Sequence, residues 1–210
     1  MPDRPFLTTE DLLRQTLGDI SGLHTLDIGA GTGRLTQMLA QLGATAVGAE
    51  PNPDAVAKAQ ESYPNIRFVT APAETIPFDT DTFDIAIFSL SLHHASDMDA
   101  ALQEARRVTK PDGRLLVIEP EMPDPLHPVV RFIVDETTIC AQAQAALDEA
   151  VASGHLTRTA TLPFADKYRM ETPAEMIADL VSVGSGRVLK EEDREAFETA
   201  FHAAHHRDED

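Results

Sequence analysis

The sequence is poor in cysteine and in basic residues. Its 210 residues include one cysteine, Cys140, which excludes an internal disulfide and a zinc site built from several cysteines. Because Cys140 falls in a segment of helical pattern, we expect it to be a small core residue. Lysine and arginine number 17 against 35 aspartates and glutamates, a formal net charge of −18. Such a charge repels phosphate backbones, so we expect no nucleic-acid partner and attribute the acidity to solubility.

Long apolar runs are also missing. No stretch reaches the roughly 20 apolar residues of a membrane-spanning helix, and the start, MPDRPFLTTEDLL, lacks the basic and apolar regions of a signal peptide. We therefore expect no membrane span and a cytoplasmic location. The length predicts a single domain over residues 1–210, since two full domains need a longer chain. The histidine pair at 205 and 206 is interpreted as part of a solvated tail, and no metal is expected.

The stretch that organises the chain reads LDIGAGTGR, from Leu26 to Arg34. An apolar run ends in three glycines at alternate positions (Gly29, Gly31 and Gly33), after which apolar residues recur at helical spacing. This pattern predicts a strand, a tight turn and a helix. Glycine permits positive φ and lets a ligand approach the backbone, and the free amides of the helix start face that ligand. Taken alone, the pattern is equally typical of an ordinary glycine-rich loop.

Two acids distinguish this turn from a phosphate-binding loop. Asp27 falls at the carboxyl end of the predicted strand, where its charge repels a pyrophosphate and attracts an ammonium group. Glu50 closes the next apolar run, 17 residues after Gly33 (50 − 33), where a carboxylate can accept both ribose hydroxyls. The sequence therefore predicts a nucleoside ligand that carries a positive charge and no phosphate.

Apolar periodicity predicts alternating strands and helices up to residue 119. The strands are expected at 23–28, 45–50, 66–69, 83–92 and 115–118, and the helices at 8–20, 32–42, 53–63 and 98–108. This alternation predicts an α/β fold with a doubly wound, mostly parallel, Rossmann-like sheet and helices on both faces. The run FDIAIFSLSL at 83–92 is apolar almost throughout, so we expect it at the centre of the sheet. A turn is expected at 110–113.

The pattern changes after Glu119. Four prolines between 120 and 128 predict an extended linker. One long helix is expected next, starting near Pro128, continuing to about Ala152 and terminated by Gly154. An antiparallel hairpin is expected next, followed by two further helices. The strands of the hairpin are placed at 157–164 and 167–171, and the helices at 172–183 and 191–204. The single domain then divides into an N-terminal helix or lid (1–22), a cofactor-binding core (23–119) and a substrate-side elaboration (120–210).

Four motifs follow one another in the first half of the chain. They are LDIGAGTGR, the acid Glu50, IPFDTDTFDIAIFSLSLHH from Ile76 to His94, and ALQEARRVTKPDGRLLVIE from Ala101 to Glu119. Over Leu23 to Glu119 the chain resembles class I S-adenosylmethionine-dependent methyltransferases, in particular the small-molecule branch of ubiquinone and menaquinone biosynthesis. The resemblance implies S-adenosylmethionine as cofactor and S-adenosylhomocysteine as product. It also implies methyl transfer to an oxygen, nitrogen or carbon nucleophile of a small molecule by in-line displacement.

The resemblance also assigns parts of the cofactor to residues. Asp27 is placed near the methionyl ammonium, the backbone of residues 29–33 around the methionine, and Glu50 on the ribose. Pro51 is placed beside the adenine, which Ala73 and Glu74 also line; Pro72 stands where the family often has an aspartate. The implied cofactor-binding residues are Asp27, Gly29, Ala30, Gly31, Gly33, Glu50, Pro51, Ala73, Glu74 and Ser89.

Residues 89–94 follow a predicted strand and, by the resemblance, face the transferring methyl group. One interpretation is that His93 or His94 is catalytic and removes a proton from an oxygen or nitrogen nucleophile. The pattern favours a structural interpretation, in which one histidine packs against the cofactor and the other caps the helix near residues 95–97. Two other function classes stay open, a non-catalytic S-adenosylmethionine-binding regulator and an NAD-dependent oxidoreductase. We expect a monomer or a homodimer.

Overall fold

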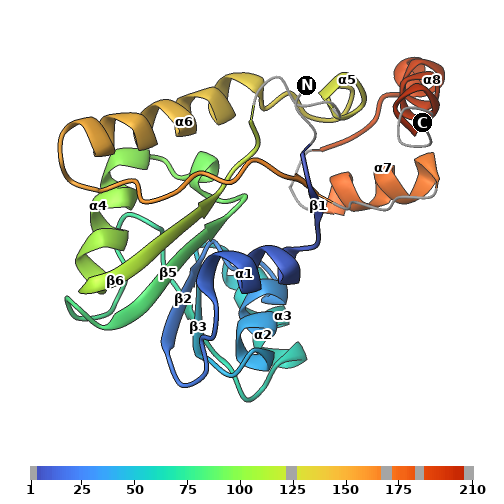
Figure 1. Cartoon of the computed structure of the whole chain (residues 1–210). Coiled ribbons are helices and arrows are strands. Elements are labelled where there is room, and N and C mark those ends of the chain that lie inside the picture. The colour runs from blue at the N-terminus through green and yellow to red at the C-terminus, as the bar shows by residue number, and fades with distance from the viewer. Residues whose placement is uncertain (1–3, 122–126, 167–171, 183–186, 206–210) are drawn as a thin grey trace. The chain divides into compact units, whose positions relative to one another are not determined.

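The computed structural model describes residues 4–121, 127–166, 172–182 and 187–205 (Figure 1). The chain packs as two compact units. One unit consists of Met1–Pro120 and Gln142–Asp166, and the other of Glu121–Ala141 and Lys167–Asp210. No helix in the described parts of the chain is long and apolar enough to cross a membrane.

The first unit is built on a five-stranded parallel sheet in the order β4-β3-β2-β5-β6. Its strands are β2 (His24–Ile28), β3 (Thr45–Glu50), β4 (Arg67–Thr70), β5 (Phe83–Ser89) and β6 (Thr109–Ile118). The parallel, doubly wound α/β sheet predicted from the sequence is confirmed. The prediction that the 83–92 run is the central strand is wrong, because β2 is the middle strand and β5 lies beside it.

Helices cover both faces of this sheet (Figure 1). They are α1 (Thr9–Leu17), α2 (Arg34–Gln41), α3 (Pro53–Ser62), α4 (Met98–Val108) and α6 (Thr137–Ala152). Along β5, Ala86 and Phe88 join the apolar cluster that contains α4 and part of α6, whereas Ile85 and Ile87 join the cluster of α1 and α2. Successive side chains of a strand point to opposite faces, so a strand covered on both sides is apolar throughout.

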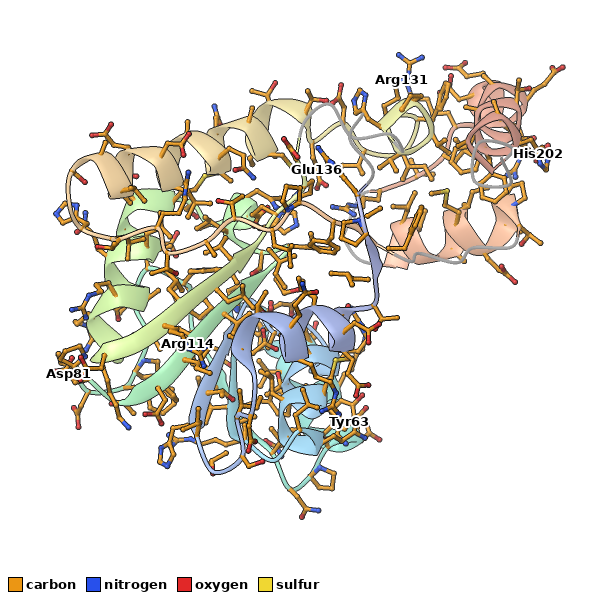
Figure 2. The ribbon with its side chains drawn as sticks, in the orientation of Figure 1. Tyr63, Asp81, Arg114, Arg131, Glu136 and His202 are labelled. Carbon is orange, nitrogen blue, oxygen red and sulfur yellow. The ribbon has the colours of Figure 1, made fainter. Side chains whose placement is uncertain are left out.

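Local capping explains most of the helix boundaries. Thr8 and Asp11 form a capping box that begins α1, and Gly18, at φ +70°, ends it three residues before the predicted end. Arg114 of β6 donates to the carbonyl of Leu17, at the C-terminal end of α1, at 2.9 Å (Figure 2). A guanidinium at this position satisfies a free carbonyl and complements the negative end of the helix dipole.

The residues predicted to form a turn, 110–113, belong to strand β6. Thr109 pairs with Phe83 and Arg114 pairs with Ile85, so the register shifts and the extra residues of β6 form an irregularity in the strand. A Cβ on Gly113 would lie 2.6 Å from Thr109 Cγ2, and glycine leaves that space free. The strand therefore begins before the turn sequence and not after it.

The long helix predicted from Pro128 is two helices, α5 (His127–Val130) and α6, so that prediction is wrong. The break contains Ile133 and Val134, whose β-branched side chains lower helix propensity. Asp135 then begins α6, because its carboxylate accepts the Thr137 amide at 3.1 Å and the Thr137 hydroxyl at 2.6 Å. Hydrogen bonding by Thr137 and by His127 lowers the pKa of Asp135 to about 2. The predicted end at about Ala152 is confirmed, with Gly154 following at φ +80°, and Cys140 is buried as predicted.

The hairpin predicted at 157–171 is not formed by the residues assigned to its first strand. Residues 157–164 have no regular secondary structure, and the predicted turn residues form β7 (Ala165–Asp166), which pairs in parallel with β1 (Phe6–Leu7). Each strand is two residues long. This is too short for an alternating hydrophobic pattern to predict the strand from the sequence. The second predicted strand, 167–171, lies outside the described residues.

The second unit is helical in its described parts. It contains α5, α7 (Pro173–Ser182), a short 3-10 helix η2 (Glu191–Asp193) and α8 (Arg194–His205). Its apolar cluster includes Val129, Met176, Leu189, Phe197 and Phe201. Thr172 and Glu175 form a capping box at the start of α7 through reciprocal hydrogen bonds of 3.2 and 3.3 Å. Both predicted C-terminal helices are therefore confirmed.

Candidate functional site

All five parallel strands of the first unit end at one edge of the sheet, and the predicted site residues lie at these ends. Residues 29–33 follow β2, Glu50 is the last residue of β3, the segment from Ala71 follows β4, and Ser89 is the last residue of β5. Parallel register brings the carboxyl ends together, and in open α/β sheets this edge is where ligands bind. The fold thus gathers residues that are far apart in the sequence.

The three glycines of the turn each meet a different spatial requirement. Gly29 (φ +78°) packs so tightly that a Cβ there would lie 2.4 Å from Ser91 Cβ, and Gly33 (φ +86°) would place one 2.6 Å from the Phe68 ring. A Cβ on Gly31 (φ +54°) would meet nothing within 4 Å. The turn is anchored by hydrogen bonds from the Gly29 and Ala30 amides to the Ala49 carbonyl, at 2.8 and 3.0 Å. Gly31 therefore leaves open space over a fixed backbone, which suits a ligand lying against it.

Asp27 lies in the middle strand and is 1% exposed. The Thr36 hydroxyl, in the first turns of α2, donates to its Oδ2 at 2.6 Å. Burial raises the pKa of Asp27 from 3.8 to about 6, although the Thr36 hydrogen bond and the charge of Arg34 act in the opposite direction. A buried carboxylate of this kind favours a cationic partner, because ionising it without one is costly.

Glu50 is held by the backbone on both of its carboxylate oxygens. Its Oε2 accepts the Gly31 amide at 2.9 Å, and its Oε1 accepts the Asn52 amide at 2.9 Å. Asn52 also caps α3 through the Asp54 amide, so the carboxylate is fixed between the glycine turn and the start of a helix. An ionised carboxylate has about four acceptor sites, so the two amides leave capacity for two hydroxyls. Pro51, between the two, is exposed.

The segment after β4 carries Ala73 and Glu74, which the sequence assigns to the adenine. Ala73 packs against the core of the first unit. Glu74 Oε1 accepts the Asp97 amide at 3.0 Å, which ties this segment to the start of α4. The Thr75 amide donates to the carbonyl of Pro72, so Pro72 stands inside a hydrogen-bonded turn. The segment is therefore ordered by its own contacts.

Arg107 and Glu104 of α4 clamp the same segment. Arg107 donates to the carbonyls of Ile76 and Phe78 at 3.1 and 2.9 Å, and Glu104 accepts the Ile76 amide at 2.7 Å. Arg107 also forms a 2.7 Å ion pair with Glu104, and hydrogen bonding to Arg107 lowers the pKa of Glu104. The clamp fixes the end of the segment that begins at Ala71.

We expect Arg107→Ala to lower the free energy of unfolding by about 1–3 kcal/mol, because it leaves two carbonyls and the Glu104 carboxylate without their partner. Urea unfolding measures this change, and amide exchange of residues 71–78 should accelerate. Arg106→Ala is the matched control. The side chain of Arg106 is exposed and makes one hydrogen bond, to the Thr109 carbonyl. Equal effects of the two variants would show that Arg107 does not clamp the segment.

The residues after β5 turn sharply at the sheet edge. Leu90 has φ +54°, which is uncommon for a leucine, and its side chain is half exposed. The Ser91 hydroxyl donates to the Ile28 carbonyl at 2.6 Å, which joins this turn to the end of β2. A short 3-10 helix, η1 (Leu92–His94), follows, so the predicted strand at 83–92 ends earlier, at Ser89. His93 is buried and His94 is exposed, with their ring centroids 4.0 Å apart.

Neither histidine caps the following helix, which was one of the predicted structural roles. Asp97 caps α4 by accepting the Ala100 amide at 3.0 Å. His93 instead contacts Glu119, with 2.5 Å between its Nδ1 and Glu119 Oε2. Sequence reasoning did not select Glu119, Ser91 or Thr36. For Glu119 a signal existed, because an acid directly after a buried parallel strand lies at the ligand-binding edge. For Ser91 and Thr36 we see no such signal.

Comparison with known proteins gives the same assignment for this part of the chain. Residues 26–117 match a family model described as a methyltransferase domain. Demethylmenaquinone methyltransferase of Chlorobaculum tepidum is 35% identical over 99 residues, 47% of this chain and 41% of that protein. The ubiquinone/menaquinone biosynthesis C-methyltransferase UbiE of Idiomarina loihiensis is 40% identical over 108 residues, 47% and 43% of the two chains. The chain thus matches less than half the length of these curated relatives.

Solved structures share the fold. YcgJ of Bacillus subtilis, named an uncharacterized methyltransferase, superposes with a TM-score of 0.54 at 28% identity, covering 67% of this chain and 66% of that one. The [4+2]-cyclase SpnF superposes with a TM-score of 0.53 at 27% identity, covering 67% and 54%. S-adenosylmethionine, the cofactor implied by the family, carries the ammonium group and the ribose that Asp27 and Glu50 suit. Residues 26–117 thus match a methyltransferase domain, and over this stretch the chain is similar to S-adenosylmethionine-dependent methyltransferases, in particular those of ubiquinone and menaquinone biosynthesis.

Proposed function

We propose that the chain binds S-adenosylmethionine at the carboxyl edge of its sheet and transfers the methyl group to an oxygen, nitrogen or carbon nucleophile of a small molecule. The observation that carries this proposal is that two carboxylates, Asp27 and Glu50, flank one glycine turn. One is buried and favours a cation, and the other is fixed by amides with capacity left for hydroxyls.

The other predicted residues keep their proposed roles at this edge. The backbone of residues 29–33 holds the methionine part, with open space over Gly31. Pro51, Ala73 and Glu74 are proposed to line the adenine, and Ser89, the last residue of β5, is proposed to contact the cofactor. The bound sulfonium supplies an activated methyl group. The task left to the protein is to exclude water and to align the nucleophile, which contributes about 7–11 kcal/mol when the geometry is good.

The methyl acceptor is proposed to be held outside the matched domain. The relatives named above act, by their names, in ubiquinone or menaquinone biosynthesis, and a hydroxylated aromatic acceptor is the corresponding proposal here. The N-terminal helix (1–22) and residues 120–210, which lie outside the family match, would form the acceptor side. Four expectations from the sequence stay predictions. They are a single domain, a cytoplasmic location, a monomeric or homodimeric state and the lack of a nucleic-acid partner.

Calorimetry and turnover test the proposal in two steps. Binding of S-adenosylmethionine and S-adenosylhomocysteine, with none of NAD, is expected, and NAD binding alone would point to an oxidoreductase. Turnover is then measured as S-adenosylhomocysteine formed with a panel of phenols, catechols, amines and reduced quinones. Binding without turnover would favour a regulator, or a reaction other than methyl transfer, as the name of the [4+2]-cyclase SpnF illustrates. Conversion with any small acceptor supports the methyltransferase.

Glu50→Ala is expected to weaken S-adenosylmethionine binding by about 1–3 kcal/mol, because the ribose hydroxyls lose their acceptor. The same calorimetric titration measures the change. Glu61→Ala, which removes an exposed carboxylate from α3, is the control for lost charge and should bind as the wild type does. Equal affinity of Glu50→Ala and the wild type would contradict the ribose role.

A further inference from the structure

The side chain of Glu119, directly after β6, is buried beside two backbone amides and a ring nitrogen of His93. Its side chain is 1% exposed, and that of His93 is 4% exposed. Glu119 Oε1 accepts the amides of Leu92 and His93, at 2.8 and 3.4 Å, while Oε2 lies 2.5 Å from His93 Nδ1. One carboxylate thus holds both the backbone of η1 and the ring of the histidine that η1 carries.

These contacts determine which nitrogen of the His93 ring carries the proton. With Glu119 ionised, its carboxylate only accepts hydrogen bonds, and Nδ1 is then the donor in the His93–Glu119 contact. A neutral imidazole with its proton on Nδ1 has an unprotonated Nε2. The two amides on Oε1 also prevent the carboxylate from rotating away, so the ring orientation is fixed together with the tautomer. The same arrangement orients the base in hydrolytic triads, where an acid holds one ring nitrogen and the other moves the proton.

We propose that Glu119 is a positioning residue that fixes His93 with a bare Nε2, so that His93 can act as base for an acceptor that enters as a neutral hydroxyl or N–H compound. This inference rests on the proposed methyl transfer. As the acceptor atom bonds to the methyl carbon, the carbon–sulfur bond breaks and its electron pair stays on sulfur. The acceptor's proton passes to Nε2, and Glu119 stabilises the resulting imidazolium; the proton then leaves to water.

The proposal narrows the class of acceptor. A nucleophile that is already anionic needs no base, whereas a neutral hydroxyl must lose its proton during or after methylation. We therefore expect a neutral phenol, catechol or amine N–H to depend on the pair, and an acceptor ionised in solution to depend on it little.

Glu119→Gln separates positioning from a merely structural role. The glutamine oxygen can still accept the two amides at the Oε1 position, which forces the amide nitrogen to face His93 Nδ1. That nitrogen donates, so Nδ1 must become the acceptor and the proton moves to Nε2. The η1 backbone is retained while the base is blocked, and a structural role alone would leave the tautomer without consequence for turnover.

Nitrogen-15 NMR of the imidazole rings at pH 8 is the first measurement, with His93→Gln used to assign the signals. The wild type is expected to show a protonated Nδ1 and a bare Nε2, and Glu119→Gln the reverse. Turnover is the second measurement. Glu119→Gln should lower kcat by at least about a hundredfold for neutral hydroxyl acceptors, and by much less for acceptors ionised at the assay pH, with unchanged S-adenosylmethionine affinity.

Failure of the positioning role of Glu119 can be distinguished from failure of the proposed methyl transfer. A wild-type His93 protonated on Nε2, or equal losses of kcat for neutral and ionised acceptors, would overturn the positioning role even if methylation is confirmed. Absent S-adenosylmethionine binding in the wild type would overturn the proposed function and the base role with it. If Glu119→Gln does not fold, the wild-type spectrum still decides the tautomer. Glu61→Gln controls for the loss of a carboxylate and should change neither measurement.

Discussion

Replacing Gly29 by alanine is expected to lower the free energy of unfolding by about 2–5 kcal/mol. A left-handed conformation costs a non-glycine residue about 1–2 kcal/mol, and Gly29 has φ +78°. The new Cβ would also lie 2.4 Å from Ser91 Cβ, and overpacking of this kind costs about 1–3 kcal/mol. Ser91 cannot move aside freely, because its hydroxyl is bonded to the Ile28 carbonyl. Thermal or urea unfolding of the two proteins measures the difference.

Two further variants separate the two causes of the expected Gly29→Ala destabilisation, the left-handed backbone conformation and the steric clash with Ser91. Gly31→Ala introduces a residue at φ +54° with nothing within 4 Å, so it should cost only the conformational term of about 1–2 kcal/mol. Combining Gly29→Ala with Ser91→Gly removes the collision, and the double variant should be more stable than the sum of the two single effects predicts. Equal costs at Gly29 and Gly31, with additive behaviour of the double variant, would show that the collision is absent.

The sequence was sufficient where a local signal sets the structure. The bounds of β3 and α4 agree with the prediction, because β3 lies in a buried apolar run and α4 begins at a capping aspartate, Asp97. The acids Asp27 and Glu50 were found by their place at the ends of two such strands, and the structure brings both to the same edge. Glycine at three positions of the turn could also be interpreted in advance, since each has positive φ.

The sequence was insufficient where the outcome depends on distant partners. Whether β2 or β5 lies in the middle of the sheet is decided by pairing across the chain, and β2 takes that place although β5 is the more apolar strand. The β1–β7 pair joins Phe6 to Ala165, a contact with no local pattern behind it. The contact of Glu119 with His93 could not be predicted for the same reason. The two residues are 26 positions apart in the sequence, and the irregular turn after β5 determines how close their side chains lie.

Asp27→Asn is expected to stabilise the ligand-free protein at pH 7 and to impair cofactor binding. Burial raises the pKa of Asp27 from 3.8 in the unfolded chain to about 6 in the folded one. The folded state therefore holds a proton more tightly than the unfolded state, and the free energy of unfolding falls as pH rises from about 4 to about 6. At about 1.4 kcal/mol per pKa unit, ionised Asp27 costs about 3 kcal/mol above pH 6. Asparagine avoids this cost and can still accept the Thr36 hydroxyl.

Denaturation at several pH values tests the sign of this effect. The stability difference between Asp27→Asn and the wild type should be small at pH 4, grow up to about pH 6 and be constant above it, reaching at most about 3 kcal/mol. Thr36→Val removes the hydrogen bond that lowers the pKa of Asp27, so it should move this window to higher pH. A variant less stable than the wild type at pH 7 would contradict the account.

Binding should show the opposite preference, because a cationic ligand stabilises the ionised carboxylate that folding alone disfavours. Asp27→Asn is expected to weaken S-adenosylmethionine binding by about 2–5 kcal/mol, the usual cost of removing one partner from a buried charge pair. In the wild type the affinity should fall as the pH drops below 6, since the ligand must then displace a proton from Asp27. Calorimetry in buffers of different ionisation enthalpy measures that released proton directly, and Asp27→Asn should release none. Asp27 is thus expected to lower the stability of the ligand-free protein and to raise its affinity for the cofactor. A buried carboxylate with these two effects is retained for ligand binding and not for folding.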